Sequence, residues 1–338
     1  MADGVTQRPA GEGSVTGREL VRRAARFQGP ERVPRFLPEP WGNDFFGLGA
    51  GVDPDFKPRV EGEDEFGCVW VKLPGDRTMG QVKVHPLSDY RRLADYRFPD
   101  YTRPGRYQPA RDRIKENREE RFVLFNTPLS LIHRLEYLRG HVEAYTDPYL
   151  YPKELEFLLD HLTDISIDAI RHGAEIGVDG IISCDDWGLQ DRPMLSPEIF
   201  RRFFKPRYAR AYGEAHRLGL VTFLHSCGHI VELLDDLIES GLDVIQMDQQ
   251  ENMGLDLLSR RFGGRLCFWC PVDIQQTMIK GSPAEVAAYA RRLIYTFGNY
   301  NGGFISKWYN SPQAVNHDPV KIEAMARSFV ENGNYPLK

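Results

Sequence analysis

The sequence predicts an α/β protein whose fold is a (β/α)8 TIM-type barrel with an N-terminal extension that contains a β-hairpin. Two observations lead to this prediction. From about residue 121 onward, short and almost continuously apolar runs alternate with amphipathic segments, which is typical of parallel strands covered by helices. Polar residues gather directly after these runs, where barrel enzymes place their chemistry. The alternative is an open doubly wound sheet, but no glycine-rich phosphate loop follows any of the runs.

Composition narrows the class of protein and its partners. The chain has 338 residues and a formal net charge of -5, which argues against nucleic acid or an anionic membrane as a partner. No apolar run approaches the ~20 residues that cross a bilayer. The five cysteines are odd in number and widely spread, so we expect no disulfide framework and a reducing, cytoplasmic location. We expect one domain overall, with a disordered polar tail at 1–18, an extension and the start of the barrel at 19–118, and the main barrel at 119–338.

The N-terminal region is rich in proline, glycine and aromatic residues. Two runs of β-forming residues, 66–73 and 80–85, flank the turn Pro74-Gly75-Asp76 and predict the hairpin. Residues 32–37 have the pattern of a further strand. The aromatic stretch 41–46 predicts either a lid over the barrel mouth or a loop packed on the surface.

The barrel region contains six recognisable strands. They cover residues 122–125, 180–184, 221–224, 244–247, 266–269 and 304–307. Helix starts are marked by Ser196-Pro197, Ser282-Pro283 and Asp318-Pro319, and helix ends by Gly241 and Gly263. Pro206 lies inside the first of these helices and predicts a kink there. Together with the N-terminal strand, these elements fall short of eight by one strand.

One strand end carries residues that can bind a metal. His225 and Cys227 are two positions apart, so on a strand their side chains emerge on the same face. An imidazole and a thiol placed side by side are ligands that zinc accepts. The alternative is a buried strand end with a satisfied imidazole and an inert thiol. We expect the reactive centre here.

Further candidates follow the other strands. We predict Asp186 and Asp185 as catalytic carboxylates, because they lie directly after the second barrel strand and can orient a ligand or move a proton. Substrate-binding candidates at neighbouring strand ends are Trp187, Asn126, Lys307 and Tyr309. Four histidines without a recognisable partner are predicted to be structural: His85, His133, His141 and His172.

Several segments together resemble the uroporphyrinogen decarboxylase superfamily. They are His225-Ser226-Cys227-Gly228, residues 241–245 and 255–264, Pro271-Val272-Asp273, and Gly302-Gly303-Phe304-Ile305. The resemblance implies a (β/α)8 barrel and one of two chemistries. The cofactor-free decarboxylases of this superfamily carry an Arg-Gln-Ala-Gly-Arg-Tyr motif, of which only Gly105-Arg106-Tyr107 has a counterpart here. The other branch consists of zinc-dependent methyltransferases that exchange methyl groups with corrinoid proteins.

In the methyltransferase branch, a His-x-Cys pair and a further cysteine bind zinc. His225 and Cys227 match the pair, whereas the loop after Lys307 contains no cysteine. We therefore expect Cys270 as the third ligand, with Asp248 as a weaker oxygen candidate. Cys267, three residues before Cys270, is expected to face the opposite way.

The leading hypothesis is zinc-dependent methyl transfer between a small methylated substrate and a thiol or a corrinoid, the corrinoid being supplied by a separate protein. One alternative is a cofactor-free decarboxylase acting on a tetrapyrrole or an aromatic carboxylate. Another is a non-catalytic barrel that binds a ligand or a corrinoid protein. The small molecule is the expected partner, and a homodimer is a further expectation, with no nucleic acid and no membrane.

Overall fold

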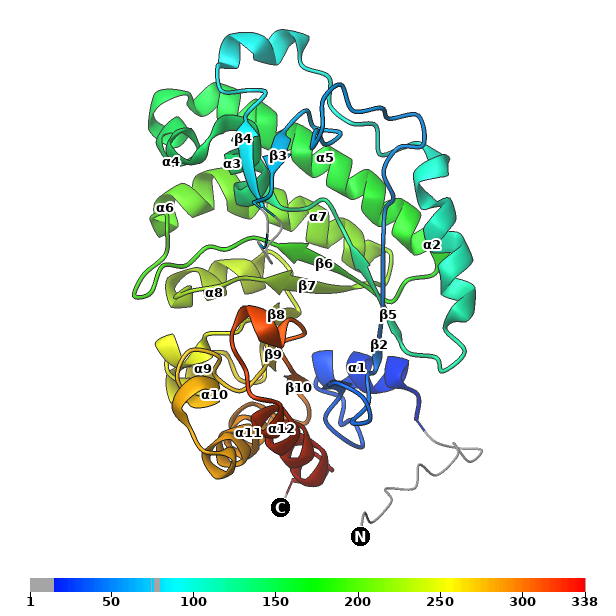
Figure 1. Ribbon diagram of the computed structural model, residues 1–338, viewed down its shortest axis with the longest axis vertical. Helices are drawn as coiled ribbons and strands as arrows, with labels where there is room; N and C mark the ends of the chain where they lie inside the picture. Colours follow the sequence, from blue (N-terminus) through cyan, green and yellow to red (C-terminus); the bar gives the residue numbers. More distant parts are fainter. Residues whose placement is uncertain (1–14, 74, 76–79, 338) are drawn as a thin grey trace.

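A sheet of eight parallel strands curves into a nearly closed barrel in the computed structural model, which describes residues 15–73, 75 and 80–337 (Figure 1). In order around the barrel the strands are β1 (Arg35–Phe36), β10 (Phe304–Lys307), β9 (Cys267–Cys270), β8 (Val244–Gln246), β7 (Val221–His225), β6 (Gly180–Cys184), β5 (Phe122–Asn126) and β2 (Phe45–Gly49). An isolated antiparallel bridge joins Phe36 of β1 to Asn43, two residues before β2 begins. The predicted (β/α)8 barrel is therefore confirmed.

From β5 onward, helices separate consecutive strands, and the helices cover the outside of the barrel (Figure 1). They are α2 (Gln108–Arg113), α3 (Leu131–Arg139), α4 (His141–Leu150), α5 (Pro152–Ile176), α6 (Pro197–Ile199), α7 (Lys205–Arg217), α8 (Val231–Glu239), α9 (Leu255–Phe262), α10 (Thr277–Lys280), α11 (Pro283–Phe297) and α12 (Pro319–Asn332). Their caps follow the sequence signals. Ser282 and Glu285 form a reciprocal capping box at the start of α11, and Asp318 caps α12. Among the described helices, none has both the length and the apolar character that a bilayer crossing needs.

Pro206 lies where the predicted kink falls. The chain passes there from α6 through a π-helical turn (Phe200–Phe204) into α7. Pro206 has no backbone N–H to donate within the helix, so the hydrogen-bond ladder must change at this point. The turn brings Phe200, Phe203 and Phe204 into the core.

The eighth barrel strand is β2, which the sequence did not reveal. The stretch 41–46 was expected to be a lid or a surface loop, but Phe45 and Phe46 pair with β5 inside the barrel. Glycine weakens a strand pattern, and both Gly47 and Gly49 lie in this strand. The residue before this strand, Asp44, is also held in place, because its carboxylate accepts two 2.7 Å hydrogen bonds from Arg32.

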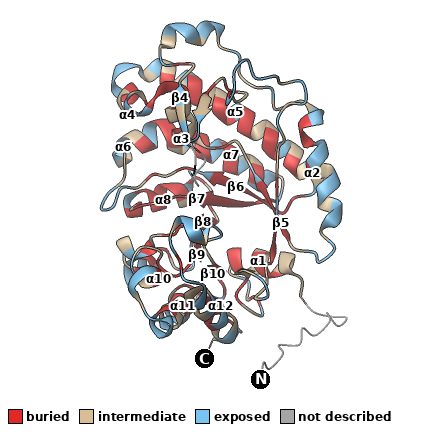
Figure 2. Ribbon diagram, viewed as in Figure 1, coloured by how far each residue is buried: buried red, intermediate tan, exposed pale blue. Residues whose placement is uncertain are grey.

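Two cores fill the molecule, one inside the barrel and one between the barrel and its helices (Figure 2). Aromatic rings dominate the inner core, where Phe45 stacks on Trp269 at 4.7 Å and both pack edge-on against Phe223. Alternate residues of each strand supply this interior, as expected for a barrel. The inner core thus fills the barrel beneath the carboxyl ends of the strands.

Helix α1 (Gly17–Ala25) closes the amino-terminal end of the barrel. Its apolar residues Val21 and Ala24 join the inner core. The guanidinium groups of Arg18 and Arg22 each lie 3.0 Å from a carboxylate oxygen of Asp179. The tail predicted at 1–18 therefore ends too late, because Gly17 and Arg18 belong to this helix; residues 1–14 lie outside the described part. This helix covers the amino-terminal end of the barrel, so a site can form at the opposite, carboxyl-terminal end.

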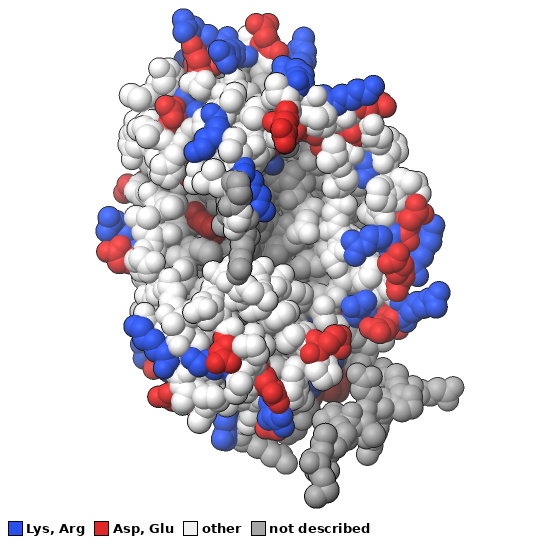
Figure 3. Space-filling view, viewed as in Figure 1, with Lys and Arg blue, Asp and Glu red and all other residues white. Residues whose placement is uncertain are grey.

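The predicted hairpin is confirmed as β3 (Val69–Val71) paired with β4 (Gln81–Val84). Of its predicted turn, Pro74 and Asp76 lie outside the described residues. The hairpin rests on the barrel through Trp70, whose ring packs edge-on against Tyr137 of α3 at 4.8 Å. On the face shown in Figure 3, acidic and basic side chains alternate around the rim, and the surface is hollowed near its centre.

Candidate metal centre

Three side chains with metal-binding atoms meet at the carboxyl ends of β6 and β7. The imidazole of His225, the thiol of Cys227 and the carboxylate of Asp186 each place one ligand atom within 4.8 Å of the others. Nε2 of His225 lies 3.4 Å from Sγ of Cys227 and 3.4 Å from Oδ1 of Asp186. All three are half-buried, so a small molecule can approach them. The structure brings together the predicted pair and Asp186.

The chain positions these three residues through the strand register. Cys184, at the end of β6, pairs with His225 at the end of β7. Asp186 follows two residues later, and its Oδ1 accepts a 2.8 Å hydrogen bond from the backbone N–H of Cys227. The turn beyond is tight, because a Cβ on Gly228 would lie 2.1 Å from the carbonyl oxygen of Gly188. Gly228 also has φ = +78°, which favours glycine.

His133 is a member of the site that the sequence placed among structural histidines. It lies in the first turn of α3, and its Nε2 is 3.6 Å from Oδ2 of Asp186. Burial opposes a charge on His133, but hydrogen bonds to Asp186 and Cys184 and the nearby carboxylates outweigh burial and raise its pKa. The only sequence signal was its place in the helix after β5, since residues after barrel strands reach the open end.

The carboxylate of Asp186 is ionised across the neutral range. Burial alone would raise its pKa, but His133, His225 and the N–H of Cys227 lower it to about 2. Cys227 behaves in the opposite way, since burial and the negative charges of Asp186 and Asp248 raise the pKa of its thiol. A bound cation would reverse that balance, because a metal-bound thiol loses its proton.

The donor set fits a zinc ion. One nitrogen, one sulfur and one oxygen ligand are all types that zinc accepts, and three protein ligands are typical of catalytic zinc sites, which keep a position open. A second hydrogen bond orients the imidazole, because Nδ1 of His225 contacts Oε1 of Gln246. Metal-bound histidines almost always make such a contact through their other nitrogen.

Cys270 does not join this group. The expectation that it supplies the third ligand assumed that it faces the barrel interior, whereas β9 turns Cys267 and Trp269 inward and Cys270 into the outer core. The assumption failed because strand parity depends on where the strand begins, and one residue of shift reverses every side chain. The third residue beside His225 and Cys227 is Asp186 rather than Cys270, and Asp248 lies in contact with Gln246 and Lys307.

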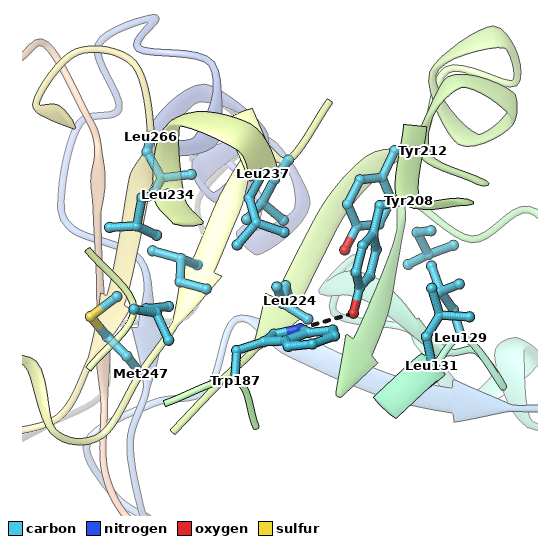
Figure 4. Packing of buried hydrophobic residues seen from close by; sticks show 14 of the residues in the cluster. Leu129, Leu131, Trp187, Tyr208, Tyr212, Leu224, Leu234, Leu237, Met247 and Leu266 are labelled. Atoms are coloured by element: carbon cyan, nitrogen blue, oxygen red, sulfur yellow. Dashed lines mark hydrogen bonds between the residues drawn. The ribbon is translucent and has the colours of Figure 1, made fainter. Parts of the chain in front are cut away.

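Asp185 and Trp187, the neighbours of Asp186, are fully buried. Asp185 caps α3, since its carboxylate accepts hydrogen bonds from the N–H groups of Leu131 and His133 at 2.6 and 3.1 Å. Burial raises the pKa of Asp185 to about 6, although the positive charge of His133 acts to lower it. Trp187 donates a 3.1 Å hydrogen bond from Nε1 to the hydroxyl of Tyr208 (Figure 4). That hydroxyl in turn donates to the carboxylate of Asp185. These two residues hold the loop that carries Asp186.

The remaining predicted residues surround the site at different depths. Asn126 is exposed at the end of β5. Lys307 is 8 % exposed and lies 2.7 Å from Oδ1 of Asp248, so it is not a free cation. Tyr309 is half-buried, and the centre of its ring lies 5.2 Å from the ammonium of Lys307. Burial and nearby acidic groups raise the pKa of its hydroxyl. Asn126 and Tyr309 are therefore the predicted substrate contacts that remain accessible.

The family model for uroporphyrinogen decarboxylase (URO-D) matches residues 74–325, which is most of the chain. The chain belongs to the uroporphyrinogen decarboxylase family. A curated uroporphyrinogen decarboxylase from Nocardia farcinica is 32% identical over 145 residues. That match covers 43% of this chain and 38% of the relative, so the chain spans well under half of that relative's length.

Among solved structures, a methyltransferase from Methanosarcina mazei has the same fold, with a TM-score of 0.71. The match covers 94% of this chain and 99% of that chain at 18% sequence identity. The family is thus shown by sequence, and the barrel with its extension is shown by structure. Both agree with the resemblance drawn from the strand-end motifs.

Proposed function

We propose that this protein is a zinc-dependent methyltransferase that moves a methyl group between a small methylated substrate and a thiol or a separate corrinoid protein. The observation that supports it is the convergence of Asp186, His225 and Cys227 at the open end of the barrel. The structural likeness to a methyltransferase agrees with it. The reaction would take place in the cytoplasm.

His225, Cys227 and Asp186 would hold the metal through Nε2, Sγ and one carboxylate oxygen. When bound, zinc would supply Lewis acidity at the reacting heteroatom and hold a thiol in its nucleophilic form. The three residues leave one position free for substrate. Asn126 and Tyr309, which remain accessible at the ends of β5 and β10, would contact the substrate.

His133 would orient Asp186. Its raised pKa keeps a proton on the imidazole, and Nε2 faces the carboxylate oxygen that points away from His225. A positive partner of this kind fixes which oxygen of Asp186 remains available to the metal.

Decarboxylation of a tetrapyrrole or aromatic carboxylate is the second candidate, because the curated relative is named a uroporphyrinogen decarboxylase. A substrate rich in carboxylates needs cations to bind it. His133 and Lys307 already face carboxylates, those of Asp186 and Asp248 respectively. This pairing favours methyl transfer over decarboxylation.

Metal content and turnover distinguish the candidates. The protein is purified without metal and zinc is added back. Bound zinc is then measured, together with methyl transfer from methylated thiols, amines and methyl ethers to a thiol or to a reduced, methyl-free cob(I)alamin. We expect one zinc per chain and activity that chelator removes. Cys227→Ser should lose both, whereas Cys270→Ala, which changes a cysteine of the outer core, should keep both. Uroporphyrinogen turnover that survives chelator would overturn the proposal, as would unchanged properties in Cys227→Ser and His225→Ala.

A further inference from the structure

A chain of hydrogen bonds runs from Lys307 through Asp248 and Gln246 to His225. The ammonium of Lys307 donates to Oδ1 of Asp248 at 2.7 Å, and Nε2 of Gln246 donates to the same oxygen at 2.8 Å. Oε1 of Gln246 then contacts Nδ1 of His225. Lys307, Gln246 and His225 are the last residues of β10, β8 and β7, and Asp248 follows β8 by two residues. All but His225 are buried, with exposures of 8, 3 and 5 % for Lys307, Asp248 and Gln246.

The direction of each bond in this chain is fixed by chemistry. An ionised carboxylate only accepts hydrogen bonds, so the side of Gln246 that faces Asp248 must be its NH₂ group. The opposite side is the amide oxygen, which also only accepts. The partner nitrogen, Nδ1 of His225, must therefore carry a hydrogen. Asp248 thus sets the orientation of Gln246, and Gln246 sets the tautomer of His225.

We propose that Gln246 and Asp248 are positioning residues that lock His225 in the tautomer with its proton on Nδ1. The lone pair of Nε2 then faces Cys227 and Asp186, at 3.4 Å from Sγ and 3.4 Å from Oδ1. In the metal-free protein the thiol of Cys227 donates to that lone pair. The part of the inference that concerns zinc rests on the proposed function, whereas the tautomer does not.

The inference gives Lys307 and Gln246 roles that their position alone does not suggest. Lys307 was predicted to bind substrate, but its ammonium forms an ion pair with Asp248. Gln246 has its side chain at the end of β8, in register with His225 and Trp269 of the neighbouring strands. Without an acceptor beside Nδ1, the two neutral tautomers of His225 become comparable in energy, and the tautomer with the proton on Nε2 cannot bind a metal there.

Nuclear magnetic resonance of the metal-free protein tests the tautomer directly. The protein is labelled with ¹⁵N-histidine, and the signals of His225 are identified by their loss in His225→Gln. At a pH where this ring is neutral, we expect a protonated, pyrrole-type Nδ1 and an unprotonated, pyridine-type Nε2. Gln246→Leu should move both nitrogens toward intermediate shifts. Gln246→Glu should restore the wild-type pattern, because one proton shared with Asp248 leaves an acceptor oxygen beside Nδ1.

Gln250→Leu is the matched control, since Gln250 is a buried glutamine that donates to the carbonyl of Pro271 and not to His225. It should leave the His225 signals unchanged. A wild-type proton on Nε2, or a Gln246→Leu spectrum that keeps the wild-type pattern, would overturn the inference. Zinc affinity, measured by chelator competition, should fall roughly 10- to 100-fold in Gln246→Leu and recover in Gln246→Glu. If no form binds zinc, the proposed function fails while the spectra still decide the tautomer.

Discussion

Nε2 of His133 lies 3.6 Å from Oδ2 of Asp186, although the two residues come from different strand–helix units of the barrel. This contact joins α3 to the loop after β6 and gives the candidate metal centre a positive neighbour. It also links the site to the hairpin, because Tyr137 packs against both His133 and Trp70.

Replacing His133 with leucine should weaken zinc binding roughly 10- to 100-fold, because Asp186 loses the group that orients it. Chelator competition on the purified variant measures the effect. His141→Leu is the control, since the side chain of His141 is 74% exposed and pairs with Glu136 rather than with the site. Equal affinity in the His133 variant and the wild type would show that Asp186 needs no such partner.

Lys307→Met should destabilise the metal-free protein by about 3–5 kcal/mol, because Asp248 would remain buried without its cation. The side chains of Lys307 and Asp248 are only 10 and 5% exposed. Urea unfolding followed by circular dichroism measures the loss. Lys115→Met, at a side chain that is 73% exposed, should change stability little. A Lys307→Met loss no larger than that of Lys115→Met would mean that Asp248 finds another partner.

Asp185→Ala should destabilise the protein by about 1–3 kcal/mol, because two N–H groups at the start of α3 and the hydroxyl of Tyr208 lose their acceptor. Denaturant unfolding measures this effect. Since Asp185 is fully buried, its role is to place the loop and helix that carry Asp186 and His133. If Asp185→Ala abolished catalysis while leaving stability and zinc affinity intact, Asp185 would have to act on the substrate itself.

The pair of His216 and Asp243 makes stability depend on pH. Nε2 of His216 and Oδ2 of Asp243 are 2.9 Å apart. In the folded state this hydrogen bond raises the pKa of His216 above its ordinary value of 6.5. The stabilising contribution is therefore complete below pH 6.5 and is lost as pH rises through the raised pKa. His216 is 42% exposed, so solvent limits the effect to below about 1 kcal/mol.

Unfolding curves of the wild type and of His216→Gln, collected from pH 5.5 to about pH 9, test this dependence. The difference in unfolding free energy should shrink as pH rises. A difference that stays constant or grows across this range would contradict the assignment of the charged form to the folded state.

The sequence revealed the elements whose signals are local. Near-continuous apolar runs and proline or serine caps identified most barrel strands and the helices between them, and the pair His225 and Cys227 followed from the two-residue strand repeat. Strand β2 was not predicted, because Gly47 and Gly49 lack the side chains that indicate a strand. It forms because β5 supplies its hydrogen bonds, which is a long-range effect that no local pattern contains.

The site residues that the sequence missed depend on packing between elements. Cys270 faces outward because β9 begins at Cys267, a boundary that a run of apolar residues does not define. His133 reaches Asp186 because Asp185 caps the helix that carries it. Gln246 belongs to the site through the register of β8 against β7. Each of these depends on one residue of register or one turn of helix.

X-ray absorption at the zinc edge, on protein loaded with one equivalent of zinc, reports the ligands of the metal centre. We expect one sulfur, from Cys227, at about 2.3 Å and the remaining ligands as nitrogen or oxygen at about 2.0–2.2 Å. The sulfur signal should vanish in Cys227→Ser and persist in Cys270→Ala. Two sulfur ligands, or a sulfur shell that survives Cys227→Ser, would contradict a centre built from Asp186, His225 and Cys227.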